Sequence, residues 1–304
     1  MALRLDSHQH FWLYNDTDYG WMDNDILKQD YLPAYLDPYI RDHGLHGTIA
    51  VQTRQADKET DFLLQLQSAN SFIKGVVGWT DLEAENLQST LSRYEGKLSG
   101  FRLSLDEETD GDRMLGTSFQ RGIRMLEDTN FTLDLLVRPH QLTNCARLAD
   151  KFPSQSFVIN HLARPDYSEA SFAHWAGDIK KLSERKNVFC KISGMVTALP
   201  PQDPDADELA IDQYLPYLDQ ALEHFTPQRL MFGSDWPLCT LAATFDEVYD
   251  ITNLYIRKLS THEQDLIMGG SAALFYNIGA VLMVRMVRKA LLVYPHLLIV
   301  NLIF

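Results

Sequence analysis

Residues 2–12 read ALRLDSHQHFW, a short apolar run that passes directly into two histidines. The first part of this stretch predicts a β-strand over Ala2–Asp6. Seven further runs of the same kind follow along the chain, at Leu45–Val51, Ile73–Trp79, Leu98–Leu103, Thr132–Val137, Phe157–Ile159, Val188–Ile192 and Leu230–Phe232. Such short apolar runs, each followed by a longer segment, are typical of buried strands in a parallel sheet.

The segments between the runs carry apolar residues every three or four positions, which predicts helices. These helices are Lys58–Asn70, Glu83–Tyr94, Ser118–Asp128, Leu142–Phe152, Phe172–Arg185 and Ile211–His224. Eight strands that alternate with helices close most naturally into a single (β/α)8 TIM barrel of the α/β class, although a doubly wound sheet gives a similar pattern. A barrel places its active site at the carboxyl-terminal ends of the strands.

Two irregular stretches interrupt this alternation, Trp12–Tyr35 and Thr197–Asp207. We expect both to be long surface loops on the face of the active site, because they follow the first and seventh predicted strands. For the second stretch, plain surface decoration is an equally good interpretation.

The composition limits the partners. The 304 residues include 27 Lys and Arg against 41 Asp and Glu, a formal charge of −14, which repels nucleic acid and anionic headgroups. The three cysteines show no Cys-x-x-Cys spacing, and residues 1–6 show no secretory signal. We therefore expect a cytoplasmic enzyme with a small-molecule substrate. A homo-oligomer is compatible with the sequence.

The carboxyl-terminal segment differs from the rest of the chain. We divide the sequence into a barrel over residues 1–280 and an apolar tail over residues 281–304. The charge-free part, Ala290–Phe304, is shorter than the roughly 20 residues that a membrane-spanning helix needs. The tail is expected to be an extra helix packed on the barrel or a partner subunit, or a segment of non-native origin.

Two histidines and an aspartate carry the first prediction about chemistry. His8 and His10 are two residues apart at the end of the first predicted strand, so that both imidazoles face the same side and could hold one divalent ion. Asp235 directly follows the eighth predicted strand, which neighbours the first strand in a closed barrel. Each feature has a plainer interpretation: a polar strand end for the histidines, and a helix cap for Asp235.

His161 and His140 follow the sixth and fifth predicted strands in the same way. A lone histidine of this kind is more often structural, and we hold that interpretation for His140, while keeping it as a candidate for the mouth. Lys191, Arg54 and Trp236 also lie near strand ends and are candidates for substrate binding. A surface or supporting charge explains Lys191 and Arg54 equally well, and for Trp236 buried aromatic packing is the more common interpretation.

Four ordered motifs resemble one known family: His8–Trp12, Asn160–Pro165, Cys190–Gly194 and Gly233–Pro237. They are similar to the signatures of the amidohydrolase-2 branch of the amidohydrolase superfamily, which includes L-fuconolactonase, L-rhamnonolactonase and pyrone-dicarboxylate lactonase. The similarity runs from about Leu3 to Ala280. It implies a barrel enzyme that opens a small sugar lactone, with His8, His10, His161 and Asp235 as catalytic residues or ligands of one divalent metal, zinc before others.

Arg102 departs from the pattern of the binuclear members of the superfamily, which carry a bridging ligand on the fourth strand. An arginine is always charged and cannot bridge two cations, so we expect one metal or none. Its planar fork of donors suits an oxygen of the substrate instead. In the mechanism that we expect, Asp235 takes a proton from water, and the three histidines hold the ion or polarise the carbonyl directly.

Two other functions stay open at this point. A decarboxylase of the same superfamily would act on a carboxylated aromatic compound, and a non-catalytic barrel would bind a sugar acid without turnover. Fingerprints of other catalytic classes, such as Gly-x-Ser-x-Gly or a Walker A loop, do not occur in the sequence.

Overall fold

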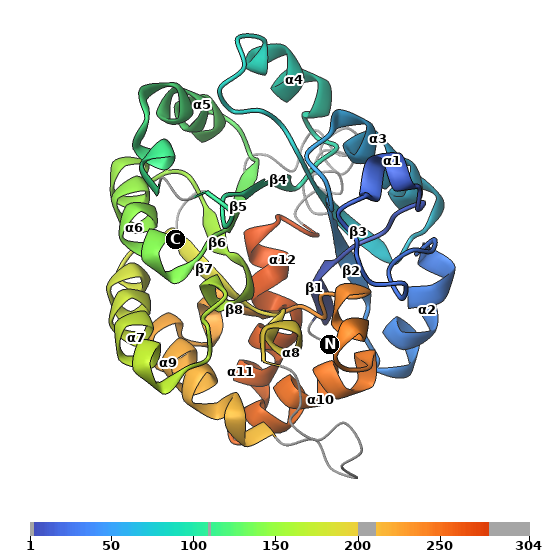
Figure 1. Ribbon diagram of the computed structural model, residues 1–304, viewed down its shortest axis with the longest axis vertical. Helices are drawn as coiled ribbons and strands as arrows, with labels where there is room; N and C mark the ends of the chain where they lie inside the picture. Colours follow the sequence, from blue (N-terminus) through green and yellow to red (C-terminus); the bar gives the residue numbers. More distant parts are fainter. Residues whose placement is uncertain (1–2, 109–110, 200–210, 280–304) are drawn as a thin grey trace, which may run out of the picture.

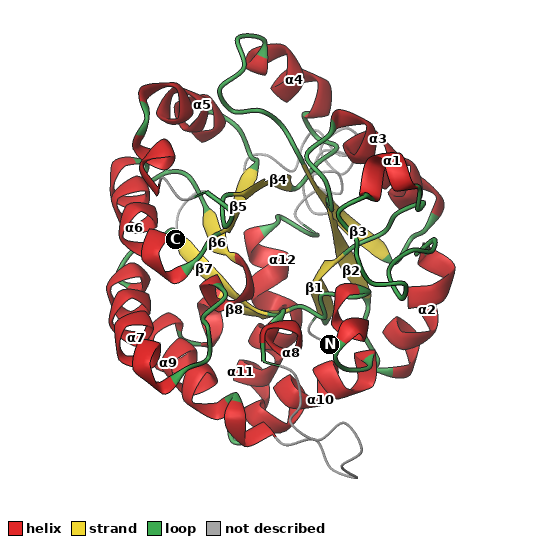
Figure 2. Ribbon diagram, viewed as in Figure 1, coloured by secondary structure: helices red, strands yellow, loops and turns green. Residues whose placement is uncertain are grey.

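A computed structural model describes residues 3–108, 111–199 and 211–279. Its eight strands are parallel and lie in chain order in one sheet that curves into a ring, with the helices outside it (Figures 1 and 2). The strands are β1 (Leu5–Gln9), β2 (Gly47–Val51), β3 (Ile73–Gly78), β4 (Gly100–Ser104), β5 (Thr132–Leu136), β6 (Phe157–Ile159), β7 (Val188–Ile192) and β8 (Leu230–Phe232). The predicted (β/α)8 barrel is confirmed.

The helices follow the predicted alternation. They are α1 (Asp16–Tyr19), α2 (Pro33–Asp42), α3 (Asp57–Ala69), α4 (Leu87–Tyr94), α5 (Thr117–Glu127), α6 (Leu142–Lys151), α7 (Glu169–Ser183), α8 (Met195–Ala198), α9 (Leu215–Phe225), α10 (Phe245–Ile256), α11 (Thr261–Asp265) and α12 (Ser271–Phe275). The predicted helix Ile211–His224 is divided into a 3-10 turn at Ile211–Gln213 and α9, because a proline occupies the first turn of α9.

The predicted loop Trp12–Tyr35 was wrong in part, since it contains α1 and the first turn of α2. Pro33 begins α2, and Pro38 inside it hides the helical pattern in the sequence. The second predicted loop begins inside α8, and its residues 200–207 lie outside the described part of the chain. The tail 281–304 lies outside it as well.

The first strand begins later than predicted. It runs from Leu5 to Gln9 instead of Ala2–Asp6, and all five of its residues are buried. The pairing with β2 shifts register between Asp6 and Gln9. The polar residues Ser7, His8 and Gln9 thus belong to the strand, which an apolar pattern could not show.

The seam between β1 and β8 closes the ring. Gln9 forms a bridge with Trp236, and the Ser7 hydroxyl donates to the carbonyl oxygen of Phe232 at 2.6 Å. The backbone amide of Asp235 donates to the carbonyl oxygen of His8 at 2.8 Å, and that of His10 donates to the carbonyl oxygen of Trp236 at 2.7 Å. The backbone of the two predicted motifs is therefore joined directly.

The interior of the barrel has two different ends. Helix α12 lies across one end, seen through the ring in Figure 1, where Phe275 and Tyr276 pack with Leu5 and Met231 inside the sheet. The larger apolar cluster fills the layer between sheet and helices. At the other end, the carboxyl-terminal end of the strands, the buried side chains include the polar residues His8, His10, His161 and Asp235. Within the described residues, no helix has the length and apolar character to cross a membrane.

Candidate active site

Four side chains meet at the carboxyl-terminal end of the barrel, and we call them the histidine cluster: His8, His10, His161 and Asp235. The Oδ1 atom of Asp235 lies 3.3 Å from Nε2 of His10, 3.7 Å from Nε2 of His8 and 3.9 Å from Nε2 of His161. All four residues are buried, with at most 5% of their surface exposed. The structure thus brings together the four residues that the sequence predicted to converge.

The backbone around Asp235 aims its side chain into the cluster. Asp235 has a φ of 58°, a left-handed conformation that is uncommon for a residue with a Cβ. The short 3-10 helix that follows, Leu238–Leu241, has Pro237 as its N-cap residue, and no side chain caps it. Helix capping therefore does not explain Asp235. A strained backbone of this kind is a feature that clusters at functional sites.

His161 is held by a similar backbone. Its φ is 55°, and the next three residues also have positive φ values. Its Nδ1 atom lies 2.8 Å from the Ser193 hydroxyl, and a Cβ at Gly194 would lie only 2.5 Å from the same nitrogen. Ser193 and Gly194, which follow β7, therefore supply both a hydrogen bond to this ring and the space for it.

The hydrogen bonds of His10 determine where its proton lies. Nδ1 of His10 is 2.8 Å from the carbonyl oxygen of Val51, which can only accept. The neutral ring therefore carries its proton on Nδ1 and presents a lone pair at Nε2, 3.3 Å from Oδ1 of Asp235. This Oδ1 is buried and has no hydrogen-bond partner. Two acceptors that face each other at this distance are suited to a cation or a proton between them.

Lys191 determines the proton position of His8. Its Nζ donates to Asp134 Oδ2 at 2.7 Å and to the carbonyl oxygen of Ser7 at 3.0 Å, and lies 3.1 Å from His8 Nδ1. An ammonium group only donates, so His8 Nδ1 accepts and the proton of the ring lies on Nε2, 3.2 Å from Nε2 of His10. A cation bound at His8 Nε2 would have to displace this proton.

The cluster fits a divalent metal such as zinc. His8, His161 and Asp235 each offer a ligand atom within 4.8 Å of the other two, and His10 contacts His8 and Asp235. Zinc bonds of about 2.0–2.1 Å in a tetrahedron place neighbouring ligand atoms roughly 3.3 Å apart. Imidazole nitrogens and a carboxylate oxygen without a hydrogen-bond partner are a donor set that zinc prefers.

The charges of the cluster are set by burial and by its own members. Burial by itself would raise the pKa of Asp235, but His161, His10 and Arg164 outweigh it and hold that pKa below its usual range. Burial lowers the pKa of His161 to about 3, and it also lowers the pKa of His8 well below its usual range. At neutral pH the cluster therefore holds a carboxylate beside neutral rings at His8 and His161.

Two other predicted site residues are buried within the barrel. Arg102 lies on β4, donates to the carbonyl oxygen of Gln52, and has an Nε atom without a partner. Lys191 is fully buried on β7 beside His8, so that its contacts are with the protein. Burial lowers the pKa of both groups, against the effect of nearby carboxylates.

The remaining three candidates have other contacts. Arg54 pairs with Asp18 of α1 at 2.5 Å and with Glu59 of α3 at 3.1 Å. The Trp236 ring is buried and packs against Tyr31, with ring centroids 5.2 Å apart. His140 is exposed on a 3-10 turn after β5. None of these observations places the three residues in the histidine cluster.

The sequence analysis missed a second polar group, which we call the mid-barrel network: Asp134, Asn160, Lys191 and Tyr276. Asp134 Oδ2 accepts from Lys191 at 2.7 Å, from Asn160 at 3.2 Å and from the Tyr276 hydroxyl at 2.9 Å. All four residues are buried. The sequence analysis named Lys191 and the motif that begins at Asn160, but not Asp134, an aspartate in the middle of the apolar run Thr132–Val137.

Comparison with known proteins agrees with this geometry. Residues 5–278 match the family model described as amidohydrolase. The chain belongs to the amidohydrolase family. The resemblance drawn from the four motifs is thereby confirmed, and the match ends near the residue where the motifs predicted it to end.

Proteins of two Burkholderia species are similar over nearly the whole chain. An L-fucono-1,5-lactonase of Burkholderia multivorans is 38% identical over 289 residues, 91% of this chain and 97% of that protein. One of Burkholderia ambifaria is 29% identical over 91% of this chain and 97% of that protein. The structure of an amidohydrolase from Burkholderia multivorans with bound zinc has a TM-score of 0.84 and 37% identity, covering 91% of this chain and 100% of that one.

Proposed function

We propose that this protein hydrolyses the ring ester of a small sugar lactone of the L-fucono or L-rhamnono type. The observation that carries the proposal is Asp235, an ionised and buried carboxylate whose Oδ1 has no hydrogen-bond partner. It lies among three imidazoles and is free to accept a proton, as a base for water requires. The similarity to two L-fucono-1,5-lactonases supports the choice of substrate class.

The reaction follows from these groups. Asp235 takes a proton from a water molecule, whose oxygen attacks the lactone carbonyl carbon. The ester bond to the ring oxygen breaks, and Asp235 returns the proton to that oxygen, which becomes a hydroxyl group. The product is the open-chain sugar acid. Arg102, whose Nε has no partner, is available to bind an oxygen of the substrate.

The positive charge that the carbonyl oxygen needs has two sources in this cluster. His8 carries its proton on Nε2 and can donate it to that oxygen. A divalent ion, held by His8, His10, His161 and Asp235, would polarise the carbonyl and lower the pKa of water to ~7. We expect at most one such ion per chain. Two equivalents of zinc or manganese in active protein would contradict this.

A panel of sugar lactones with a pH-indicator dye tests the proposed function. We expect acid release from L-fucono- or L-rhamnono-lactone above the uncatalysed rate. Carbon dioxide release from carboxylated aromatic compounds, with no lactone hydrolysis, would favour the decarboxylase instead. Saturable binding of sugar acids without any turnover would favour a binding protein.

The location in the cell is also part of the proposal. We infer a reducing, cytoplasmic compartment, and the three free thiols support it. Cys145, Cys190 and Cys239 are all buried, and none forms a disulfide. Burial raises the pKa of Cys145 and of Cys190 to about 12, which keeps both thiols protonated and unreactive.

A further inference from the structure

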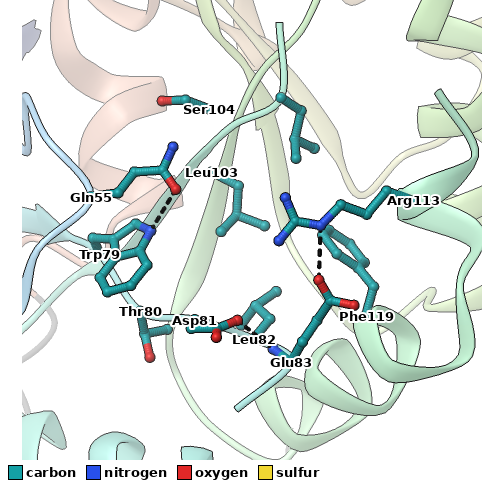
Figure 3. A pocket seen from close by; sticks show the side chains of 11 residues that line it. Gln55, Trp79, Thr80, Asp81, Leu82, Glu83, Leu103, Ser104, Arg113 and Phe119 are labelled. Atoms are coloured by element: carbon teal, nitrogen blue, oxygen red, sulfur yellow. Dashed lines mark hydrogen bonds and ion pairs between the residues drawn. The ribbon is translucent and has the colours of Figure 1, made fainter. Parts of the chain in front are cut away.

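A recess lies at the rim of the barrel mouth, beside β3 and β4. We call it the outer recess, and the residues that matter for it are Gln55, Trp79, Asp81, Glu83, Ser104 and Arg113. Figure 3 shows Gln55, Trp79 and Ser104 on one side of it, and Arg113, Glu83 and Phe119 on the other. None of these residues belongs to the histidine cluster or to the mid-barrel network.

The strand register places the outer recess next to the candidate site. Gly78 of β3 pairs with Phe101 of β4, so Trp79 lies level with Arg102. Trp79 directly follows β3, and its Nε1 donates to Gln55, which follows β2, so both residues lie at the carboxyl-terminal end of the strands. Ser104 follows Arg102 by two residues, which puts it on the same face about 7 Å farther toward the mouth. A substrate bound at Arg102 can therefore extend toward the outer recess.

The lining of the outer recess is suited to a neutral sugar. Trp79 is partly exposed and offers an aromatic face, with its Nε1 fixed by Gln55 at 3.2 Å. Ser104 and Asp81 add a hydroxyl and a carboxylate to the lining. The one lining cation, Arg113, is already paired with Glu83 at 2.8 Å. The lining therefore contains one cation, Arg113, and two carboxylates, Asp81 and Glu83, and this excess of negative charge disfavours the binding of an acidic group.

The size of the outer recess is limited. Its volume is about 210 Å³, whereas one water molecule needs roughly 10–15 Å³. It can thus hold roughly 14 to 21 water-sized groups, which is enough for one pyranose ring with its hydroxyl groups but not for a longer chain.

We propose that the outer recess is a subsite for a neutral sugar unit attached to the lactone, so that the enzyme also opens lactones of disaccharide acids. The inference rests on the proposed function, because the lactone ring must react at the histidine cluster. The reaction that supplies such a substrate is an oxidation at the anomeric carbon of a reducing disaccharide.

Steady-state hydrolysis of paired lactones tests the proposal. The probes are L-fucono-1,5-lactone for the proposed function, D-glucono-1,5-lactone as the matched monosaccharide lactone, and three disaccharide lactones with that same reacting ring, cellobiono-, maltobiono- and melibiono-1,5-lactone. We expect the wild type to hydrolyse at least one disaccharide lactone. Trp79→Ala should lower kcat/KM for that substrate about tenfold, the loss of an aromatic contact, and change kcat/KM for the matched monosaccharide lactone less than about twofold.

Two further variants keep the test decisive. Trp79→Phe retains an aromatic face and should keep most of the activity on the disaccharide lactone, even where the alanine variant does not fold. Trp21→Ala removes a tryptophan that is 52% exposed and outside the outer recess, and should change neither activity. An equal loss on both lactones in Trp79→Ala would overturn the proposal.

Failure of the proposed function gives a different result. If L-fucono-1,5-lactone is hydrolysed and every disaccharide lactone is refused, the subsite is wrong and the proposed function stands. If no lactone is hydrolysed, the proposed function fails, and the subsite as a part of that reaction fails with it.

Discussion

Asp134 and Asp235 are both buried carboxylates inside the same barrel, but their surroundings differ. In the mid-barrel network, Lys191, Asn160 and Tyr276 all donate to Asp134. In the histidine cluster, Oδ1 of Asp235 has no hydrogen-bond partner. Burial of an unpaired polar atom costs stability, so such an atom needs an explanation, for example a bound ion or a role in the reaction. The comparison separates a carboxylate that supports the barrel from one that is free to react.

The largest effect is expected for Asp235→Asn. An amide retains the shape of the carboxylate but cannot accept a proton from water, so kcat for a sugar lactone should fall at least about 10²–10⁴-fold. The loss should appear in kcat more than in KM, because the base acts in the transition state. Steady-state kinetics measures this loss, and thermal unfolding checks that the fold is intact. A near-normal kcat would remove Asp235 from the mechanism.

Asp134→Ala should act strongly on stability, unlike Asp235→Asn. Lys191 would remain buried without its carboxylate partner, which costs about 3–5 kcal/mol of the free energy of unfolding in urea. The double variant Asp134→Ala with Lys191→Met removes the unpaired charge and should recover part of this loss. A single variant as stable as the wild type would show that the mid-barrel network does not support the fold.

Asp6 gives a smaller effect that depends on pH. Burial raises its pKa to about 6, in spite of hydrogen bonds from Ser234 and His8. Its folded-state pKa is thus above the unfolded value, so its contribution to stability is fully present below pH ~4 and is lost as pH rises through about 6. The change is on the order of 3 kcal/mol.

Asp6→Asn should remove this part of the pH dependence, because an amide does not titrate. Urea unfolding at intervals from about pH 4 to pH 7 measures the difference between variant and wild type. Asp25→Asn serves as the control, since the side chain of Asp25 is 98% exposed. Parallel curves for Asp6→Asn and the wild type would contradict the raised pKa.

The smallest effect is expected from removal of residues 281–304. Both carboxylates and all members of the histidine cluster precede this segment, and the family match ends at residue 278. Truncation after Ala280 should leave kcat within about twofold in soluble protein. A large fall in kcat with the fold intact would show that the segment completes the site.

Much of the fold could be predicted because buried parallel strands are short apolar runs. The bounds of β6, β7 and β8 agree with the predicted Phe157–Ile159, Val188–Ile192 and Leu230–Phe232. The prediction failed where polar residues enter a strand, as in β1, and where proline interrupts a helix, as in α2. The polar residues of β1 have partners far away in the sequence, such as Phe232 for Ser7.

The candidate site was predictable to the extent that its residues directly follow strands. His161 and Asp235 could be found in this way, whereas Asp134 looked like an exception within an apolar run. Its partner Tyr276 lies 142 residues away and directly follows α12. Trp236 and Arg54 contact Tyr31 and Asp18 within the protein, and their role toward the substrate stays a prediction. The position of a residue relative to a predicted strand shows at which end of the barrel it lies, but it does not show which side chains it contacts there.

The seam between β1 and β8 has a consequence for the newly made protein. His8 precedes Asp235 by 227 residues in the chain, and its carbonyl oxygen accepts a hydrogen bond from the backbone amide of Asp235. Long-range contacts of this kind form late in folding. An incomplete chain therefore has no assembled site and cannot attack esters during synthesis, and β1 keeps an unpaired edge until β8 arrives.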